Sequence, residues 1–214
     1  MTIYQISGLG AGVEVFSTIS LSCKTVFIPW LQPHKKESLK DYSKRMATTI
    51  DTEEEFCLMG VSFGGIVCQE IAKIVNPKTI FLISSVTQSS EVPFIMKLPA
   101  KLGLNSLIPQ KGIERSKEIT HFLFGAKRKS EKQFLNNILD KIDIEYLKWS
   151  TAQIGLWNQK SRLNNTVRFH GKKDFLFPRM FQKRVDYWLE NGHFASVQEG
   201  KKISVIVNEI IQEC

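Results

Sequence analysis

The sequence has no long apolar run. Its longest stretch without an acidic or basic residue covers the 14 residues 56–69, and three glycines and a serine interrupt it. A helix needs about 20 apolar residues to cross a bilayer, so we expect no membrane span. The first charged residue is Glu14, so no basic segment precedes an apolar run and no signal peptide is predicted. We therefore expect a cytoplasmic protein.

Cysteine and histidine are scarce, with four of each in the chain. No two cysteines form a CxxC pair, and Cys57 and Cys68 lie in apolar segments, where a free thiol behaves as a small hydrophobe. The other two cysteines are Cys23 and Cys214. This use of cysteine favours reduced thiols in a reducing compartment. The histidines are too scattered for metal-ligand spacing, and no HExxH motif is present, so we expect no metal.

Length and charge define a broad class. The 214 residues suit one domain, and 43% hydrophobic with 23% charged residues is an ordinary globular composition that excludes disorder. The formal charge of +8 comes from 29 Lys+Arg against 21 Asp+Glu. The basic residues form separate short groups without interleaved aromatics or a zinc-finger motif. We interpret them as a solvated surface and expect no nucleic-acid partner.

Short apolar runs alternate with helical patterns. The runs predict mostly continuous buried strands, as in a parallel sheet covered on both faces. Amphipathic spacing predicts helices over 38–50, 63–75 and 200–212. The sequence thus predicts an α/β fold with a mostly parallel sheet of about six strands and helices on both faces. The expected strands are 3–7, 25–29, 56–61, 79–84, 166–170 and, more weakly, 185–189.

One interval, residues 87–159, interrupts this alternation. Helical spacing dominates it, as in 131–142 and 144–152, and no convincing strand is visible. The interval is much longer than a crossover requires. We therefore predict a single domain over 1–214 with a helical cap, 87–159, inserted into it above one end of the sheet.

The sharpest local feature is the segment Gly-Val-Ser-Phe-Gly-Gly at 60–65. It joins an expected strand to an expected helix, the context in which a Gly-x-Ser-x-Gly sequence forms a nucleophile elbow. Such a turn strains the serine backbone and projects its side chain from the sheet edge, while the glycines permit close backbone approach. Ser62 is therefore the candidate nucleophile; the alternative is a glycine-rich turn that only packs a helix on a strand.

A serine nucleophile needs a base. His193 follows the last expected strand and precedes the C-terminal helix, at the same sheet edge as Ser62. His34 lies in a loop rich in proline and lysine, His121 lies in the insertion, and His170 ends a strand where packing or capping is the simpler role. His193 is thus the candidate base, against the alternative of an ordinary loop histidine.

The base needs an acid that orients it. Asp174 lies on the loop after the expected strand 166–170, again at a carboxyl end. Its alternatives are an ordinary loop aspartate or a helix cap. Asp186 lies inside a strand-like run, Glu190 is only three residues before the histidine, and Glu91 comes late after its strand. Asp174 is the best placed of these.

The glycine-rich segment at 7–12 follows the first expected strand and exposes backbone N–H groups. We predict an oxyanion hole made by the amides of Leu9 and Phe63, with Gly10 as the nearby alternative donor. Neither a dinucleotide-binding fingerprint nor a phosphate loop fits this segment, because the glycine spacing and the Gly-Lys-Ser/Thr ending are absent. We therefore expect no cofactor.

With these motifs in this order, the chain resembles the α/β-hydrolase family over nearly its whole length. The resemblance rests on the glycine loop at 7–10, the elbow at 60–65, the loop at 171–174 and Gly192-His193. It implies a nucleophile–acid–base triad in the order Ser62, Asp174, His193 and a cap after the family's sixth strand. Two departures from the family pattern are the absence of two N-terminal antiparallel strands and a serine, Ser7, where many members have histidine.

The resemblance implies a carboxylesterase-like serine hydrolase that cleaves a small ester or thioester through an acyl-enzyme. Its partner would be a small molecule with an acyl carbonyl. Cleavage of a C–C or amide bond and a receptor with slow turnover are alternatives. Substrate-pocket candidates are Gly10, Trp30, Phe124 and Trp157, with Phe94, Met96 and Phe122 as further apolar residues of the insertion.

Overall fold

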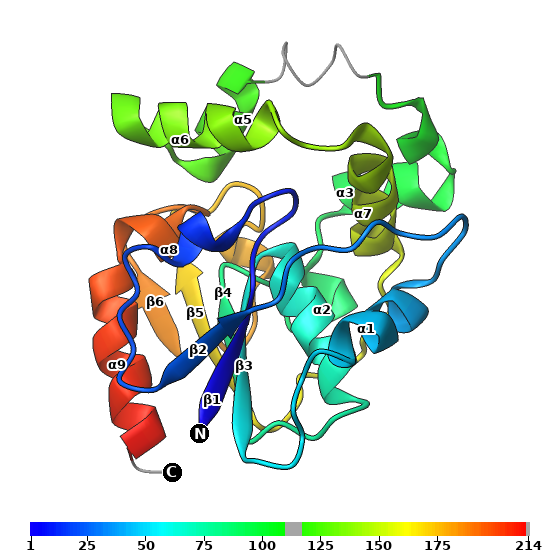
Figure 1. The fold of residues 1–214 in the computed structure, drawn as a ribbon. Coiled ribbons are helices and arrows are strands. Elements are labelled where there is room, and N and C mark those ends of the chain that lie inside the picture. The colour runs from blue at the N-terminus through cyan, green and yellow to red at the C-terminus, as the bar shows by residue number, and fades with distance from the viewer. Residues whose placement is uncertain (110–116, 213–214) are drawn as a thin grey trace.

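Six parallel strands form one sheet (Figure 1). The structure is a computed structural model that describes residues 1–109 and 117–212, so Cys214 lies outside the described residues. The strand order is β2-β1-β3-β4-β5-β6, and every neighbouring pair is parallel. The predicted α/β class with six parallel strands is therefore confirmed. The strands are β1 (Thr2–Ile6), β2 (Lys24–Phe27), β3 (Phe56–Val61), β4 (Ile80–Ile83), β5 (Thr166–Gly171) and β6 (Tyr187–Leu189).

Each expected strand is present, but several ends differ from the prediction. The sixth strand, expected over 185–189, begins only at Tyr187. The reason is a side chain: the carboxylate of Asp186 accepts the backbone N–H of Arg168 at 2.8 Å. The side chain thus takes the place of a ladder carbonyl, and regular pairing starts one residue later, with Tyr187 opposite Phe169.

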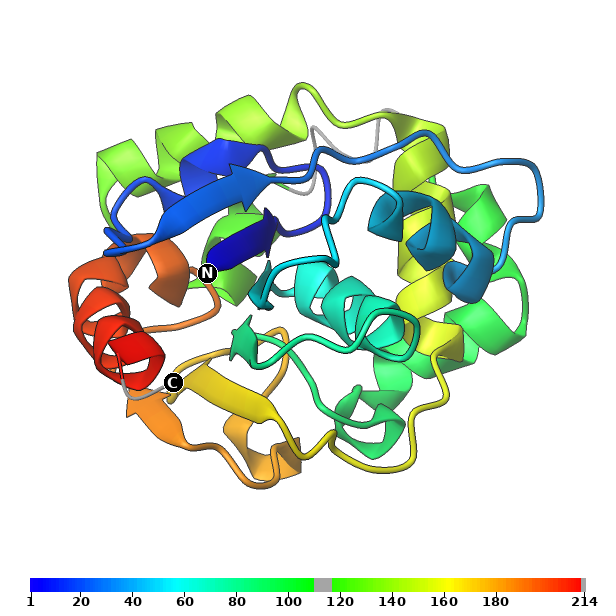
Figure 2. The ribbon, with the colours of Figure 1, turned by 60° about the horizontal axis from the view of Figure 1, so that its bottom comes forward.

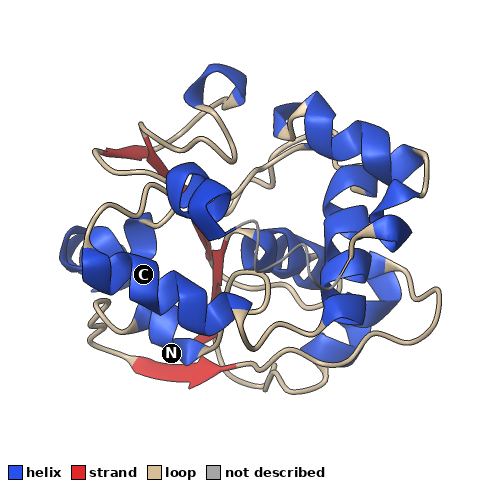
Figure 3. Cartoon of the chain, turned by 90° about the horizontal axis from the view of Figure 1, so that it is seen from above, coloured by secondary structure: helices blue, strands red, loops and turns tan. Residues whose placement is uncertain are grey.

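Helices cover both faces of the sheet. In Figure 2, α1 and α2 lie on one side of the strands and α9 lies on the other. From above, the strands run through the middle with helices on both sides (Figure 3). The helices of the described residues are α1 (Leu39–Ala47), α2 (Phe63–Ala72), α3 (Phe94–Lys101), α5 (Lys117–Phe124), α6 (Lys129–Leu139), α7 (Ile144–Leu156), α8 (Ala195–Gln198) and α9 (Gly200–Gln212).

Two apolar cores follow from this layering. One joins α1 and α2 to the sheet through fully buried residues such as Leu58, Ile66 and Leu82. The other joins α9 to the opposite face through residues such as Met59 and Val207. Successive residues of β3 alternate between these cores, which is why its sequence is apolar throughout.

The interval 87–159 holds α3, α5, α6 and α7, and its described residues, 87–109 and 117–159, contain no strand. Figure 1 shows α5 and α6 above the carboxyl ends of the strands, and α3 packs against α7. We call this interval the cap segment; its role as a cap and the division of the chain remain predictions. Within residues 1–109 and 117–212, no helix combines the length and apolarity that a membrane span needs.

A buried ion pair ties the start of the cap segment to the sheet. The guanidinium of Arg168 on β5 lies 3.1 Å from the carboxylate of Glu91, and both side chains are fully buried. Arg168 also donates to the carbonyl of Ser85, while Glu91 accepts backbone N–H groups of Thr87 and Lys183. Because each charge has several partners, the cost of burying the pair is offset.

Candidate active site

Ser62 occupies a strained turn between β3 and α2. Its φ of 53° and ψ of −119° lie outside the regions that ordinary residues favour. The turn is tight because a Cβ on Gly64 would collide with the carbonyl oxygens of Ile6 and Ser7 at the end of β1. Glycine is therefore required there, and the close approach aims the Ser62 side chain out of the carboxyl edge of the sheet.

Ser62 and His193 are hydrogen-bonded. The Oγ of Ser62 lies 2.8 Å from Nε2 of His193. His193 stands on the loop between β6 and α8 and is 2% exposed. The rings of Phe124 and Phe177 meet its imidazole edge to face, with centroids 4.9 and 5.5 Å away. The imidazole is thus held between two aromatic rings with one nitrogen directed at the serine hydroxyl.

The other nitrogen of His193 faces Asp174. Nδ1 lies 2.8 Å from Oδ2 of the carboxylate, which sits on the loop after β5. The second carboxylate oxygen, Oδ1, accepts the backbone N–H groups of Leu176 and Phe177 at 2.9 and 2.8 Å. Because an ionised carboxylate only accepts, Nδ1 of His193 carries a proton and Nε2 is left as the acceptor for the serine hydroxyl.

A second histidine lies against the same carboxylate. Nε2 of His170 is 2.9 Å from the carbonyl oxygen of Phe177 and 3.5 Å from Oδ2 of Asp174. Burial lowers the pKa of His170 to about 4, although the charge of Asp174 acts in the opposite direction. His170 is therefore neutral at pH 7, with its Nε2–H donated to Phe177, and it supports the loop that carries Asp174.

The expected oxyanion loop lies beside the elbow. A Cβ on Gly8 would stand 3.6 Å from Cβ of Ser62. The carbonyl of Gly8 accepts both the Trp30 indole N–H, at 3.0 Å, and the amide of Ala11, at 3.1 Å. In the part of the chain that the structure describes, the amides of Leu9 and Phe63 form no hydrogen bond. Two unused donors therefore lie on the two segments that flank the serine.

A cavity of about 320 Å³ opens at Ser62 and His193. The sheet side supplies the glycine loop and the two loops that carry Asp174 and His193, and the cap segment supplies four helices or their ends. Its lining is largely apolar. Besides Ser62 and His193 it consists of Gly8, Leu9, Ala11, Val15, Val61, Met96, Thr120, Leu123, Phe124, Leu135, Ile138, Leu139, Ile142, Leu147, Thr151, Ile154, Leu176, Phe177, Phe194 and Ser196.

Of the four pocket residues predicted, Phe124 lines the cavity and three do not. The Trp30 ring stacks on Phe63, with centroids 5.5 Å apart, and its N–H is used by the glycine loop. Trp157 is 6% exposed and donates to the carboxylate of Glu70 at 2.7 Å. Gly10 packs against Ile142. These three do not line the cavity, and the contacts that the structure gives them are packing contacts or hydrogen bonds to other parts of the fold.

The other apolar residues proposed for the pocket divide in the same way. Met96 lines the cavity, whereas Phe94 and Phe122 are 69% and 65% exposed. The aliphatic side chains of α6 and α7 that line the cavity were not predicted from the sequence. Leu135, Ile138 and Leu139, with Ile142 beyond, follow helical spacing, so periodicity indicates an apolar face. Periodicity cannot tell that this face is turned toward Ser62.

The alternative bases and acids are engaged elsewhere. His34 is exposed, and His121 pairs with the side chain of Asn136 at 2.8 Å. Asp186 accepts from Arg162 and Arg168, and Glu190 pairs with Lys172 at the surface. Within the described ranges, no cluster of three or more His, Cys, Asp or Glu is positioned to hold a metal ion.

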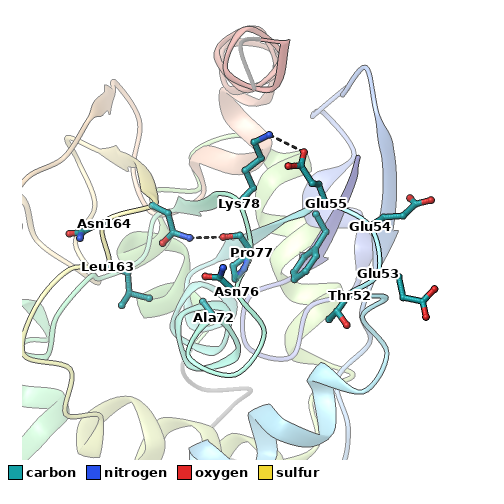
Figure 4. A pocket seen from close by; sticks show the side chains of 12 residues that line it. Thr52, Glu53, Glu54, Glu55, Ala72, Asn76, Pro77, Lys78, Leu163 and Asn164 are labelled. Carbon is teal, nitrogen blue, oxygen red and sulfur yellow. Dashed lines mark hydrogen bonds and ion pairs between the residues drawn. The ribbon is translucent and has the colours of Figure 1, made fainter.

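A larger hollow of about 720 Å³ lies at the opposite, amino-terminal edge of the sheet (Figure 4). Residues 52–56, 76–78 and 163–165 line it, and Lys78 pairs with Glu55 across 2.9 Å. In open α/β sheets ligands bind outside the carboxyl ends of the strands. The smaller cavity at Ser62 is therefore the candidate site.

The parallel sheet, the strained serine turn and the helices inserted after β4 define the α/β-hydrolase fold. No protein-family model matches the chain, and the search of curated proteins finds no match. Solved structures do match. A hydrolase from Oleispira antarctica is 12% identical, with a TM-score of 0.79, over 100% of this chain and 91% of that one.

Two further solved structures have the same fold. An esterase from Exiguobacterium antarcticum is 16% identical, with a TM-score of 0.71, over 99% of this chain and 92% of that one. A thioesterase of the prodiginine biosynthetic pathway of Streptomyces coelicolor is 10% identical, with a TM-score of 0.63, over 98% and 89%. At these identities the likeness establishes the fold, and the chain has the α/β-hydrolase fold.

Proposed function

We propose that this protein is a serine hydrolase that cleaves a small carboxylic ester or thioester. The observation that carries the proposal is the continuous hydrogen-bonded series Ser62–His193–Asp174, with both contacts at 2.8 Å, whose Ser62 and His193 line an apolar cavity. The solved esterase and thioesterase structures of the same fold support this reaction class. Ser62, His193 and Asp174 are all buried, and fixed hydrogen-bonding groups stabilise developing charge more strongly in such surroundings than in bulk water.

In the proposed acylation step, Ser62 Oγ attacks the acyl carbon while its proton moves to Nε2 of His193. The carboxylate of Asp174 stabilises the imidazolium that forms and keeps its Nδ1–H in place. The carbonyl oxygen becomes an oxyanion. Collapse of the tetrahedral intermediate breaks the bond to the alcohol or thiol, which leaves with the proton from Nε2. The product of this step is an acyl ester of Ser62.

The oxyanion is proposed to bind the amides of Leu9 and Phe63. Phe63 is the first residue of α2, so its N–H points out of a helix N-terminus, where the dipole favours negative charge. One such donor contributes about 2.7–4 kcal/mol to transition-state stabilisation. Deacylation repeats the sequence with water as the nucleophile and His193 as its base, and it releases the acid.

The cap segment, 87–159, is proposed to be the roof of the substrate pocket. Its helices supply Met96, Phe124 and Ile154 to the lining, while the sheet loops supply the reacting groups. The sheet and its loops would thus carry the catalytic residues, and the cap segment would bind the substrate. The role of Phe124 is then twofold, since the same ring packs against His193.

A fluorophosphonate probe tests the proposal directly, because it phosphonylates only an activated serine. Wild type is expected to label, and Ser62→Ala is expected not to. Ser150→Ala is the matched control: Ser150 is also buried, but its hydroxyl bonds to the carbonyl of Tyr146 within α7. Failure of folded wild type to label, or equal labelling of Ser62→Ala, would contradict the proposal.

A further inference from the structure

Among residues 1–109 and 117–212, His193 of the proposed catalytic series is the only ionisable side chain that lines the cavity at Ser62. Besides Ser62 and His193, the described polar side chains of the lining are the hydroxyls of Thr120, Thr151 and Ser196, and Thr151 already bonds to α7 carbonyls and to Asn105. An ionised group that entered this space would lose its hydration without gaining an ion partner. The cavity therefore selects against charge.

Two separate helices of the cap segment supply a large part of the aliphatic lining. Ile138 and Leu139 belong to α6, and Leu147 and Ile154 belong to α7. Figure 1 shows these helices in different parts of the roof, α6 over the β6 side and α7 over the α1 and α2 side. The apolar space thus extends under both helices from the reacting serine.

The cavity volume sets the size of what it can hold. One water-sized group takes about 30 Å³ in a condensed phase, so a cavity of about 320 Å³ holds on the order of ten non-hydrogen atoms. Methyl octanoate is a molecule of about this size on the same count. A two-carbon acyl group would leave most of the apolar lining without contact.

We infer that the site binds an uncharged, medium-length aliphatic acyl chain of about six to eight carbons. This length follows from the cavity volume of about 320 Å³ and a volume of about 30 Å³ for each non-hydrogen atom. This inference rests on the proposed function, because it takes Ser62 as the point of attack. It deepens that function by naming the acyl class: the chain lies along the aliphatic side chains of α6 and α7, and a terminal carboxylate or phosphate on it is rejected.

Methyl esters of straight-chain acids provide the test, because methanol is the smallest alcohol product and the acyl chain is then the only variable. Acid release is followed by titration at constant pH. Burial of each further methylene is worth about 0.8 kcal/mol, which predicts a rise in kcat/KM of about fourfold per carbon. The rise should continue from acetate to about octanoate and end before dodecanoate, once the cavity is full.

A second comparison isolates charge from length. The monomethyl ester of octanedioic acid has the octanoate chain with a carboxylate at its far end. We expect its kcat/KM to be lower than that of methyl octanoate by at least about a hundredfold, because the described residues that line the cavity supply no Lys or Arg to compensate the buried carboxylate. Equal rates for the two esters would overturn the inference.

Two variants test where the acyl chain of the substrate lies. Ile138→Trp on α6 and Leu147→Trp on α7 each add volume inside the cavity, and at least one should move the peak to shorter acids. Leu156→Trp is the matched control on α7, since Leu156 is 51% exposed and lies outside the cavity; its profile should equal that of wild type. Titration with the fluorophosphonate measures the active enzyme in each preparation.

The outcomes distinguish failure of the proposed acyl specificity from failure of the proposed serine hydrolase activity. Wild type that labels at Ser62 yet prefers acetate, prefers dodecanoate or hydrolyses no methyl ester refutes the acyl class while the serine hydrolase remains. Wild type that fails to label refutes both. If neither Ile138→Trp nor Leu147→Trp changes the dependence of kcat/KM on acyl length, the acyl chain does not lie under α6 or α7, and the inference is wrong.

Discussion

Replacing Asp174 with asparagine tests how the loop after β5 controls the base. Oδ1 of Asp174 accepts two backbone N–H groups, from Leu176 and Phe177, and Oδ2 faces His193. In Asp174→Asn the side-chain oxygen keeps the two backbone bonds, so the amide nitrogen takes the place of Oδ2. The flipped amide would leave both N–H groups unpaired, at about 1–3 kcal/mol each.

The new NH₂ group donates, so it can pair with His193 only if Nδ1 gives up its proton. The imidazole then carries its proton on Nε2 and donates to Ser62 instead of accepting from it. A base in the wrong tautomer lowers kcat about 10⁴-fold in a comparable serine–histidine–aspartate series. We expect a loss of that order here, equivalent to about 5 kcal/mol of transition-state stabilisation.

The assay is hydrolysis of p-nitrophenyl butyrate, with thermal unfolding followed by circular dichroism. Asp186→Asn is the matched control, because Asp186 also accepts a backbone N–H, that of Arg168, but does not contact His193. It should keep its turnover per folded molecule. If folded Asp174→Asn retains more than about a tenth of wild-type kcat, the tautomer argument is refuted.

Three further predictions concern the surroundings of the site. Burial lowers the pKa of His170 to about 4, below its value of about 6.5 in the unfolded chain. Unfolding between these pH values therefore takes up a proton. As a result, the free energy of unfolding falls by up to about 3 kcal/mol as the pH drops from 6.5 to 4. Urea titrations at both pH values should show this fall in wild type and a smaller one in His170→Gln; equal falls would contradict it. Arg168→Met should cost about 3–5 kcal/mol because it leaves Glu91 buried and unpaired, and adding Glu91→Gln should recover part of that loss; an additive loss in the double variant would show that the two charges are not coupled. Gly64→Ala should unfold at lower temperature in calorimetry and lose fluorophosphonate labelling, since its Cβ collides with the carbonyl of Ser7; unchanged melting would mean that the turn relaxes freely.

Much of the fold was predictable from local pattern. The apolar run at 56–61 became β3 with the predicted bounds, and the segment from Phe63 became α2. Strand ends were less predictable. Tyr187 begins β6 because the Asp186 side chain, not a backbone carbonyl, receives the Arg168 amide. Such substitutions of side chain for backbone depend on a neighbouring strand that lies far away in the sequence.

The three proposed catalytic residues and the residues of the pocket differ in how well the sequence predicted them. Ser62, Asp174 and His193 each follow a strand, and parallel strands bring their carboxyl ends to one edge, so their meeting was predictable. Trp30 and Trp157 were plausible pocket residues by type alone, yet both are used in packing. A large aromatic side chain can pack in a core or line a pocket equally well. The neighbouring residues in the sequence do not show which of the two it does.

The sequence by itself determined the class of fold, the place of the strained turn and the three side chains that could react. It did so because strand periodicity, glycine spacing and strand ends are local properties. Only the tertiary structure decided the two 2.8 Å contacts, the second histidine against Asp174 and the aliphatic roof under α6 and α7. Those depend on which faces of distant helices and loops are packed together, and packing is a property of the whole chain.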